Sequence, residues 1–420
     1  LFVWIIIMFF AHQRLCLLLS SLLFCSSTYA VRNSIDPSSP ALAAFVNNAI
    51  ATNPRMIAAR ARYEASRSSV LAASKPSFNP ELSLDADNGE TQDRSVSLSQ
   101  TIDWRNARET RTSIAEMQSA AEKATFIATQ RSLASELVLG LIRYRIGIAR
   151  RKLTDQGVKV MSDFAALAKQ RFDQGDLNQV ELSVASLAYF EARVADADAQ
   201  VQVKKAIQQV AYIHPNVSRT QWPILESLQG LPAVQTESLA VQIPTVIAAQ
   251  RRANAALATI ELRKRETKSN PTLSLLAGKE GDEDLVGFGF SIPLYFRNNF
   301  THEVDAATHE FKSAQQLADD ELRRVFTQIE TSSETYLLYY SAWKEWEGTG
   351  LEDVDTQTAQ LQALWEAGEL STSEFLLQVQ QTLDTRATAV SLKQDVFEAW
   401  LAWLSASGLI DQWLQLEIPQ

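Results

Sequence analysis

Two long stretches without proline constrain the fold of this chain more than any other feature of its sequence. None of the 12 prolines lies within positions 81–214 or 294–418, whereas four of them cluster within positions 215–244. Because proline breaks the interior of a helix, each stretch predicts long helices, and the cluster predicts an irregular linker between them. Residues 107–172 alone would form a straight helix of about 100 Å, which is wider than a single globular core.

The two stretches are copies of each other, which indicates a tandem duplication. Three pairs of segments match in order: FNPELSLDAD (78–87) with SNPTLSLLAG (269–278), SLSQTIDWRN (97–106) with GFSIPLYFRN (289–298), and FDQGDLNQVEL (172–182) with WEAGELSTSEF (365–375). The offset between matching segments grows only from 191 to 193 residues. We therefore expect a mainly α fold in which each copy runs helix, two strands, long helix, glycine break and helix.

The helix after each glycine break carries an apolar stripe at spacings of three and four residues. Such a stripe predicts a coiled-coil seam against the long helix of the same copy, although ordinary amphipathic helices in a bundle would show similar spacing. The stripes are Leu177, Val180, Val184, Leu187, Val194 and Val201 in the first copy, and Leu376, Val379, Leu383, Val390, Phe397, Leu401 and Leu404 in the second. The first helix of each copy is expected from the Asn53 cap to Ala73, and from near Pro244 to about Lys268.

Four segments alternate apolar with small or polar residues, which is typical of strands with one apolar face. They are residues 78–87, 94–103, 271–279 and 285–294. A soluble sandwich and a membrane barrel both show this pattern. Four strands are too few to close a barrel, and open edges are not tolerated in lipid. Strands placed in a membrane would therefore have to be pooled between chains, and three chains would supply twelve.

The first thirty residues resemble a secretory signal peptide. A short polar segment with Arg14 precedes an apolar run of about ten residues, which is too short to span a membrane, and small residues follow it up to Ala30. Both cysteines, Cys16 and Cys25, lie in this segment, so the exported chain would hold no disulfide. Lipid attachment at Cys25 is disfavoured because the preceding residue is Phe24.

Charge and motif content argue against nucleic-acid binding and catalysis. The net charge is −10 and becomes −11 without Arg14, whereas nucleic-acid binding favours clustered positive charge. His302 and His309 lie seven residues apart, too far for a compact metal site, and no nucleophile, phosphate-loop or cofactor motif is present. We expect no enzyme activity, no cofactor and no metal site.

The ordered set of these features resembles the TolC-like outer-membrane factors, the exit ducts of bacterial tripartite efflux pumps and type I secretion systems. The resemblance rests on the export signal, the duplicated order of elements, the NP-strand, SLSQ/FSIPL and FRN elements, and the F/W-x-x-G-D/E-L turn. It covers roughly residues 46–408 and is nearest to the cation-efflux branch. It implies a homotrimer whose twelve strands form one outer-membrane β-barrel, continuous with a periplasmic tube of twelve helices.

The resemblance also implies an organisation and partners for the chain. The segments expected are a signal peptide (1–30), a leader (31–45), a first repeat (46–213), an equatorial linker (214–243), a second repeat (244–408) and a C-terminal tail (409–420). The expected partners are a periplasmic adaptor protein, an inner-membrane transporter and outer-membrane lipid, with no nucleic acid.

Two sets of site residues follow from the resemblance. A pore constriction is expected at Glu374, with Glu181 as its equivalent in the first copy, although the second acidic position of the family is here Leu377. A cap interaction beside the turn is the structural alternative for both glutamates. The hairpin tips that an adaptor would contact are expected at Gly175, Asp176 and Leu177 and at Gly368, Glu369 and Leu370, with Asp176 capping the returning helix.

Two other functions fit part of the sequence. A periplasmic adaptor also carries a helical hairpin, but it would need one hairpin flanked by β-rich modules, and this chain predicts two hairpins and four strands. A coiled-coil scaffold without a pore would leave the alternating strands unexplained.

Overall fold

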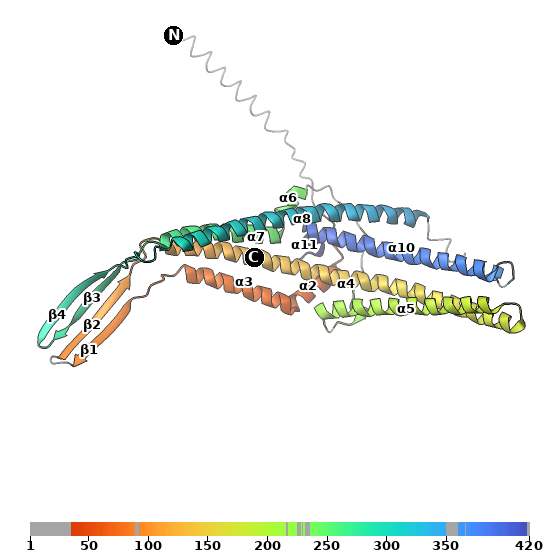
Figure 1. Ribbon diagram of the computed structural model, residues 1–420, viewed down its shortest axis with the longest axis horizontal. Coiled ribbons are helices and arrows are strands. Elements are labelled where there is room, and N and C mark those ends of the chain that lie inside the picture. The colour runs from red at the N-terminus through yellow and green to blue at the C-terminus, as the bar shows by residue number, and fades with distance from the viewer. Residues whose placement is uncertain are drawn as a thin grey trace, which may run out of the picture.

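The chain is an elongated molecule with a β-sheet at one end and two helical tips at the other (Figure 1). The computed structural model describes residues 35–88, 92–215, 217–224, 228, 230–231, 236–349, 360–365 and 367–417. The expected signal peptide and parts of the linker and the C-terminal tail lie outside these residues. The elements are α2 (Pro40–Thr52), α3 (Pro54–Ala73), β1 (Glu81–Asn88), β2 (Gln92–Thr101), α4 (Ala107–Gln174), α5 (Gln179–Ile213), a 3₁₀ turn (Arg219–Gln221), α6 (Thr236–Ala240), α7 (Pro244–Glu266), β3 (Thr272–Glu280), β4 (Glu283–Ser291), α8 (Thr301–Thr349), α10 (Thr372–Ser407) and α11 (Ile410–Leu414).

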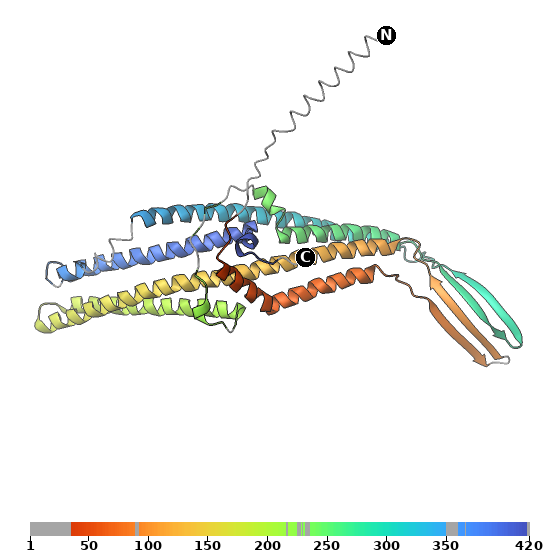
Figure 2. The ribbon, with the colours of Figure 1, turned by 180° about the vertical axis from the view of Figure 1, so that it is seen from behind.

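Each repeat combines one long continuous helix with two shorter helices. In the first repeat α4 runs from the sheet to the tip, with α3 along its sheet-side half and α5 along its tip-side half (Figures 1 and 2). In the second repeat α7 and α10 flank α8 in the same way. The predicted mainly α fold with duplicated helical hairpins and four strands is therefore confirmed.

One buried asparagine joins the two short helices of the first repeat end to end. Asn53, which is 4% exposed, accepts a hydrogen bond at Oδ1 from the Arg55 amide (2.9 Å), as the predicted N-cap of α3. Its Nδ2 donates to the carbonyl of Ile213 (3.1 Å), the last residue of α5. A single side chain thus satisfies one terminal group of each helix.

The seam between α5 and α4 consists of small residues, which contradicts the predicted stripe. Most of the buried positions on α5 are alanines and valines, and Val203 and Val210 lie against Gly147 and Gly140 of α4. Val180, Leu187, Val194 and Val201 are instead 45–70% exposed. Small side chains occupy the seam because they let the backbones of α4 and α5 approach closely. The larger apolar residues of α5 therefore face outward.

The stripe on α10 faces inward, as predicted. Val379, Leu401 and Leu404 are buried, and Leu376, Leu383, Val390 and Phe397 are half-buried. The tryptophans around this helix also pack inside the protein, with Trp343, Trp365, Trp400, Trp403 and Trp413 buried.

The four strands form one antiparallel sheet in the order β1-β2-β3-β4, so the two repeats meet at the β2–β3 pair. The strands lie within a few residues of their predicted ranges. Register places Leu82, Leu98, Leu275 and Phe288 in one row across the sheet, and Leu84, Val96, Ala277 and Val286 in the next. This face is exposed, with Leu84 at 72% and Val286 at 84%. The opposite face carries serines, glycines and acidic residues, together with Leu276 and Leu285.

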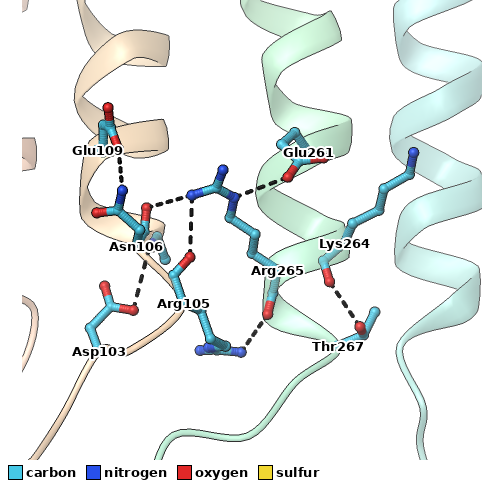
Figure 3. Close-up of polar contacts among 9 residues, drawn as sticks. Asp103, Arg105, Asn106, Glu109, Glu261, Lys264, Arg265 and Thr267 are labelled. Carbon is cyan, nitrogen blue, oxygen red and sulfur yellow. Dashed lines mark hydrogen bonds and ion pairs between the residues drawn. The ribbon is translucent and has the colours of Figure 1, made fainter.

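Reciprocal arginine contacts hold the two repeats together where the sheet meets the helices. Arg105 Nη1 donates to the carbonyl of Arg265 (2.6 Å), and Arg265 Nη1 donates to the carbonyls of Arg105 (3.2 Å) and Asn106 (2.9 Å). Figure 3 shows these bonds beside Asp103, whose carboxylate accepts from the Arg108 amide (3.1 Å) at the start of α4. The WRN element of the sequence therefore fixes the junction.

The largest apolar core lies midway along the molecule, where α2 and α11 close around α4 and α10. Neither short helix was predicted: α2 begins at Pro40, inside the expected leader, and α11 lies in the expected C-terminal tail. Arg131 and Asp411 form an ion pair of 2.6 Å there with little exposure, and the Ser38 amide donates to the carbonyl of Trp413 (2.7 Å). Among the described residues, no helix combines the length and the apolar character needed to cross a bilayer.

The close contact of α4 with α5 predicts opposite effects for two glycines of α4. A Cβ at Gly140 would lie 2.8 Å from Val210 Cγ2, whereas a Cβ at Gly157 would lie 3.5 Å from Leu383 Cδ1, an ordinary contact. We expect Gly140→Ala to lower the free energy of unfolding by about 1 kcal/mol or more, because valine is stiff and the helices must separate. Gly157→Ala should raise it by roughly 0.5–1 kcal/mol through helix propensity.

Guanidinium unfolding of the purified protein, followed by circular dichroism, measures both effects. A Gly140→Ala protein as stable as the Gly157→Ala protein would contradict the tight seam.

Candidate functional site

The two helical tips have the same backbone structure. Gly175 ends α4 in the left-handed conformation with φ of 87°, and its amide donates to the Phe172 carbonyl (3.0 Å) while the Asp176 amide donates to the Arg171 carbonyl (2.9 Å). At the second tip Gly368 has φ of 79°, and the same pair of bonds runs to Trp365 (3.0 Å) and Leu364 (2.9 Å). Both tips are Schellman motifs, in which glycine is favoured because it adopts positive φ without a steric penalty.

The cap of the returning helix is Asn178, which corrects the prediction of Asp176. Asn178 Oδ1 accepts from the amides of Val180 (2.9 Å) and Glu181 (3.0 Å), and α5 begins at Gln179. Asp176 is exposed and its amide is already used in the turn. The cap of the returning helix therefore lies two residues later than predicted.

Both glutamates of the predicted constriction close capping boxes. Glu181 Oε2 accepts from the Asn178 amide (3.0 Å). In the second repeat Glu374 Oε2 accepts from the Ser371 amide (3.0 Å) and hydroxyl (2.6 Å), while the Glu374 amide donates to Ser371 Oγ (3.3 Å). The cap interaction considered from the sequence is therefore present at both tips. These bonds use only one oxygen of each carboxylate.

The hydrogen bonds from Ser371 also keep Glu374 charged. They lower the pKa of the Glu374 carboxyl below its usual value, the side-chain hydroxyl contributing more than the backbone amide. The carboxylate is exposed and is therefore ionised at neutral pH. The cap is fully formed above the usual carboxyl pKa and weakens as the pH falls through the lowered one.

The tip leucines anchor the tips to a cluster of side chains that joins the two hairpins. Leu177 and Leu370 are half-buried against this cluster, whereas Gly175, Asp176, Gly368 and Glu369 are exposed. The cluster consists of Met161, Phe164, Ala168, Ala185, Ala188, Leu361, Trp365, Phe375 and Val379. The exposed part of each tip is therefore the glycine and the acid.

Aromatic contacts within this cluster join the first hairpin to the second. Trp365 stacks on Phe375 with ring centroids 5.0 Å apart, and Phe164 of the first hairpin lies 4.8 Å from Trp365 and 5.1 Å from Phe375. Arg171 lies 4.8 Å above the Trp365 ring and donates to its carbonyl (3.2 Å). Sequence periodicity missed this contact because it joins residues almost 200 positions apart.

Beyond the cluster, a cavity of about 270 Å³ separates the hairpins. Leu153 and Gly157 of α4, Glu191 of α5, and Leu383 and Asp384 of α10 are among its lining residues. The aromatic cluster is thus the contact that holds the tips of the hairpins together within one chain.

The described residues contain no group of three or more histidine, cysteine or acidic side chains placed to hold a metal ion. His302 and His309 are exposed on α8, as expected for solvated surface residues. His214 is 8% exposed and lies edge-on to Phe45, and burial lowers the pKa of its imidazole.

Comparison with known families finds a similarity in the first repeat. Residues 45–213 match the model of the family described as Outer membrane efflux protein. No protein with a curated description matches the sequence.

Solved structures of outer-membrane channels share the fold over about nine tenths of the chain. The CmeC channel of Campylobacter jejuni superimposes with a TM-score of 0.73 at 13% identity, covering 90% of each chain. The open MtrE channel of Neisseria gonorrhoeae gives 0.73 at 13% identity, covering 90% of this chain and 94% of that one. A CusC structure gives 0.73 at 14%, with 89% and 93% covered. Because the TM-scores and identities of the three channels are so similar, they do not assign the chain to one branch of these channels. Proximity to the cation-efflux branch stays a prediction.

Proposed function

We propose that this chain, whose first repeat belongs to the outer membrane efflux protein family and whose fold is that of TolC-like outer-membrane factors, is a passive exit duct. Three copies would conduct substrates across the outer membrane from a periplasmic adaptor and an inner-membrane transporter. The transporter would select the substrate, because a passive duct needs no recognition site of its own.

The observation that carries this proposal is the open sheet with one exposed apolar face. Within the described residues, β1 and β4 each pair on one side only. An apolar face suits contact with lipid, but unpaired backbone groups at the two edges are costly there. Pairing β1 of one copy with β4 of the next satisfies both edges, and three copies close a barrel of twelve strands.

The helices extend the same arrangement into the periplasm. The exposed stripe of Val180, Leu187, Val194 and Val201 on α5 is available to a neighbouring copy because it does not face α4. Two long and four short helices per chain, with the short ones stacked in pairs, would give three copies a wall of twelve helices.

The tips supply the proposed adaptor contact and the proposed constriction. Gly175, Asp176, Gly368 and Glu369 are exposed at the end farthest from the sheet. Glu374 and Glu181 lie in the first turns of the returning helices, where three copies of a carboxylate around an axis would attract cations. An adaptor or scaffold role is disfavoured because the chain has two hairpins and a sheet with two open edges.

The test of the proposed function is assembly and conductance of the protein. We expect the purified chain to come from the outer-membrane fraction as a trimer and to open ion-conducting channels in planar bilayers. A periplasmic monomer without conductance would exclude the exit-duct function.

Glu374→Gln separates the charge of Glu374 from its cap, because glutamine at the same position also closes a capping box. We expect the half-blocking concentration of a divalent cation to rise about tenfold, which corresponds to roughly 1.4 kcal/mol of binding. Glu181→Gln is the matched variant in the first repeat and should have a smaller effect. Unchanged block in the Glu374→Gln channel would remove this residue from the constriction.

Substitution of the tip glycines is expected to abolish export without preventing assembly of the trimer. Nothing lies within 4 Å of a Cβ built at Gly175 or Gly368, so a substitution there strains only the backbone. Valine at both positions is expected to distort the tips, at about 1–2 kcal/mol each, and to abolish export in a cell-based efflux assay while trimers still form. Asparagine tolerates positive φ and serves as the control. Normal export by the valine variants would show that the adaptor binds elsewhere.

A further inference from the structure

A groove opens where the sheet joins the helices, at the end of the helices farthest from the tips. It has a volume of about 590 Å³, and three chain connections meet at its walls. Trp104 comes from the β2–α4 connection, Lys268 from the α7–β3 connection, and Leu294, Tyr295 and Phe296 from the β4–α8 connection. The groove therefore belongs to both repeats.

The apolar wall of the groove continues the exposed face of the sheet. Val96 and Leu98 of β2 and Phe288 and Phe290 of β4 belong to that face. The connections that follow these two strands carry Trp104, which is 65% exposed, and Phe296, which is 82% exposed. Aromatic residues at the end of an apolar band are typical of a membrane–water interface.

The walls of the groove are held in place by contacts within the protein. Trp104 Nε1 donates to the carbonyl of Ser269 (3.0 Å), which fixes the indole and leaves its ring faces open. Tyr295 packs edge-on against Phe300, with centroids 4.8 Å apart. The reciprocal contact of Arg105 and Arg265, which Figure 3 shows near Thr267 of the groove lining, ties the β2–α4 connection to the end of α7.

Lys268 is the one cation that lines the groove, and its ammonium has no side-chain partner among the described residues. Arg263 and Arg265, which precede Lys268 at the end of α7, are engaged with Glu266 (2.6 Å) and Glu261 (3.0 Å). At the far end of the sheet, register aligns Asp87, Asp93, Glu280 and Glu283 in one row on the opposite face, next to a row with Arg94, Lys279 and Asp284 on the apolar face. At the helix-side end, Lys268 is the charged residue that lines the groove.

We propose that this groove binds one anionic phospholipid of the periplasmic leaflet, with the headgroup phosphate at Lys268 and an acyl chain along Trp104, Leu294 and Phe296. The inference rests on the proposed membrane location of the sheet. Charge complementarity with Lys268 and continuity with the apolar face both favour a lipid of the bilayer over a free anion, which would leave the apolar wall uncovered.

Native mass spectrometry of the delipidated trimer, titrated with phosphatidylglycerol or phosphatidylcholine, tests this site. We expect up to three tightly bound phosphatidylglycerol molecules per trimer and weaker binding of phosphatidylcholine. Lys268→Gln should weaken phosphatidylglycerol binding about fivefold, as expected for one basic residue at an anionic surface, and leave phosphatidylcholine binding unchanged. The matched control is Lys75→Gln, because Lys75 is exposed in the α3–β1 connection and does not line the groove.

Equal binding of the two lipids would overturn the lipid site, and so would an equal loss of phosphatidylglycerol binding in the Lys268 and Lys75 variants. Either result would leave the channel proposal standing. Conductance of the same preparations in planar bilayers separates the two proposals. A wild-type protein that neither trimerises nor conducts would remove the proposed function, and the lipid site with it.

Discussion

Hydrogen bonding at the edges of the sheet is the constraint on which the rest of the structure depends. The β2–β3 pair satisfies the backbone where the two repeats meet, but the outer edges of β1 and β4 have no partner in the part of the chain that the structure describes. One face of the sheet is also apolar and exposed, so under the proposed membrane location the single chain would be incomplete as a folded unit in lipid. Duplication supplies four strands, and association of copies would have to supply the remaining edge contacts.

The helices connect the sheet to the tips and are fixed to one another along the molecule. α4 and α8 continue directly from the sheet connections, and the reciprocal contact of Arg105 with Arg265 ties the start of α4 to the end of α7. Near the opposite end, Phe164, Trp365 and Phe375 join the hairpins. Between these two points the mid-molecule core around α2 and α11 fixes the spacing of the helices. The tips are therefore positioned by three separate contacts along the molecule.

Sequence reasoning succeeded where one residue type dictates the local structure. Asn53 before Pro54 marked a helix start, glycine at 175 and 368 marked the tips, and alternation gave the faces of the sheet. It failed on α5, because the spacing of large apolar residues does not show which neighbour they face, and alanines make the closer seam. It also missed α2, although Ser39 before Pro40 carries the same cap signal as Asn53. The cross-hairpin aromatic cluster depends on long-range packing and left no local signal.

The joint at Asn53 has a consequence for the order in which the chain folds. Its Nδ2 reaches the carbonyl of Ile213, 160 positions later in the sequence. Contacts between residues so distant are slow to form, because a long loop must close before they contribute any stability. We therefore expect the start of α3 to acquire this neighbour only after α4 has formed and the chain has reversed at Gly175. On this reasoning the joint closes late in folding, in molecules whose first hairpin is already in register.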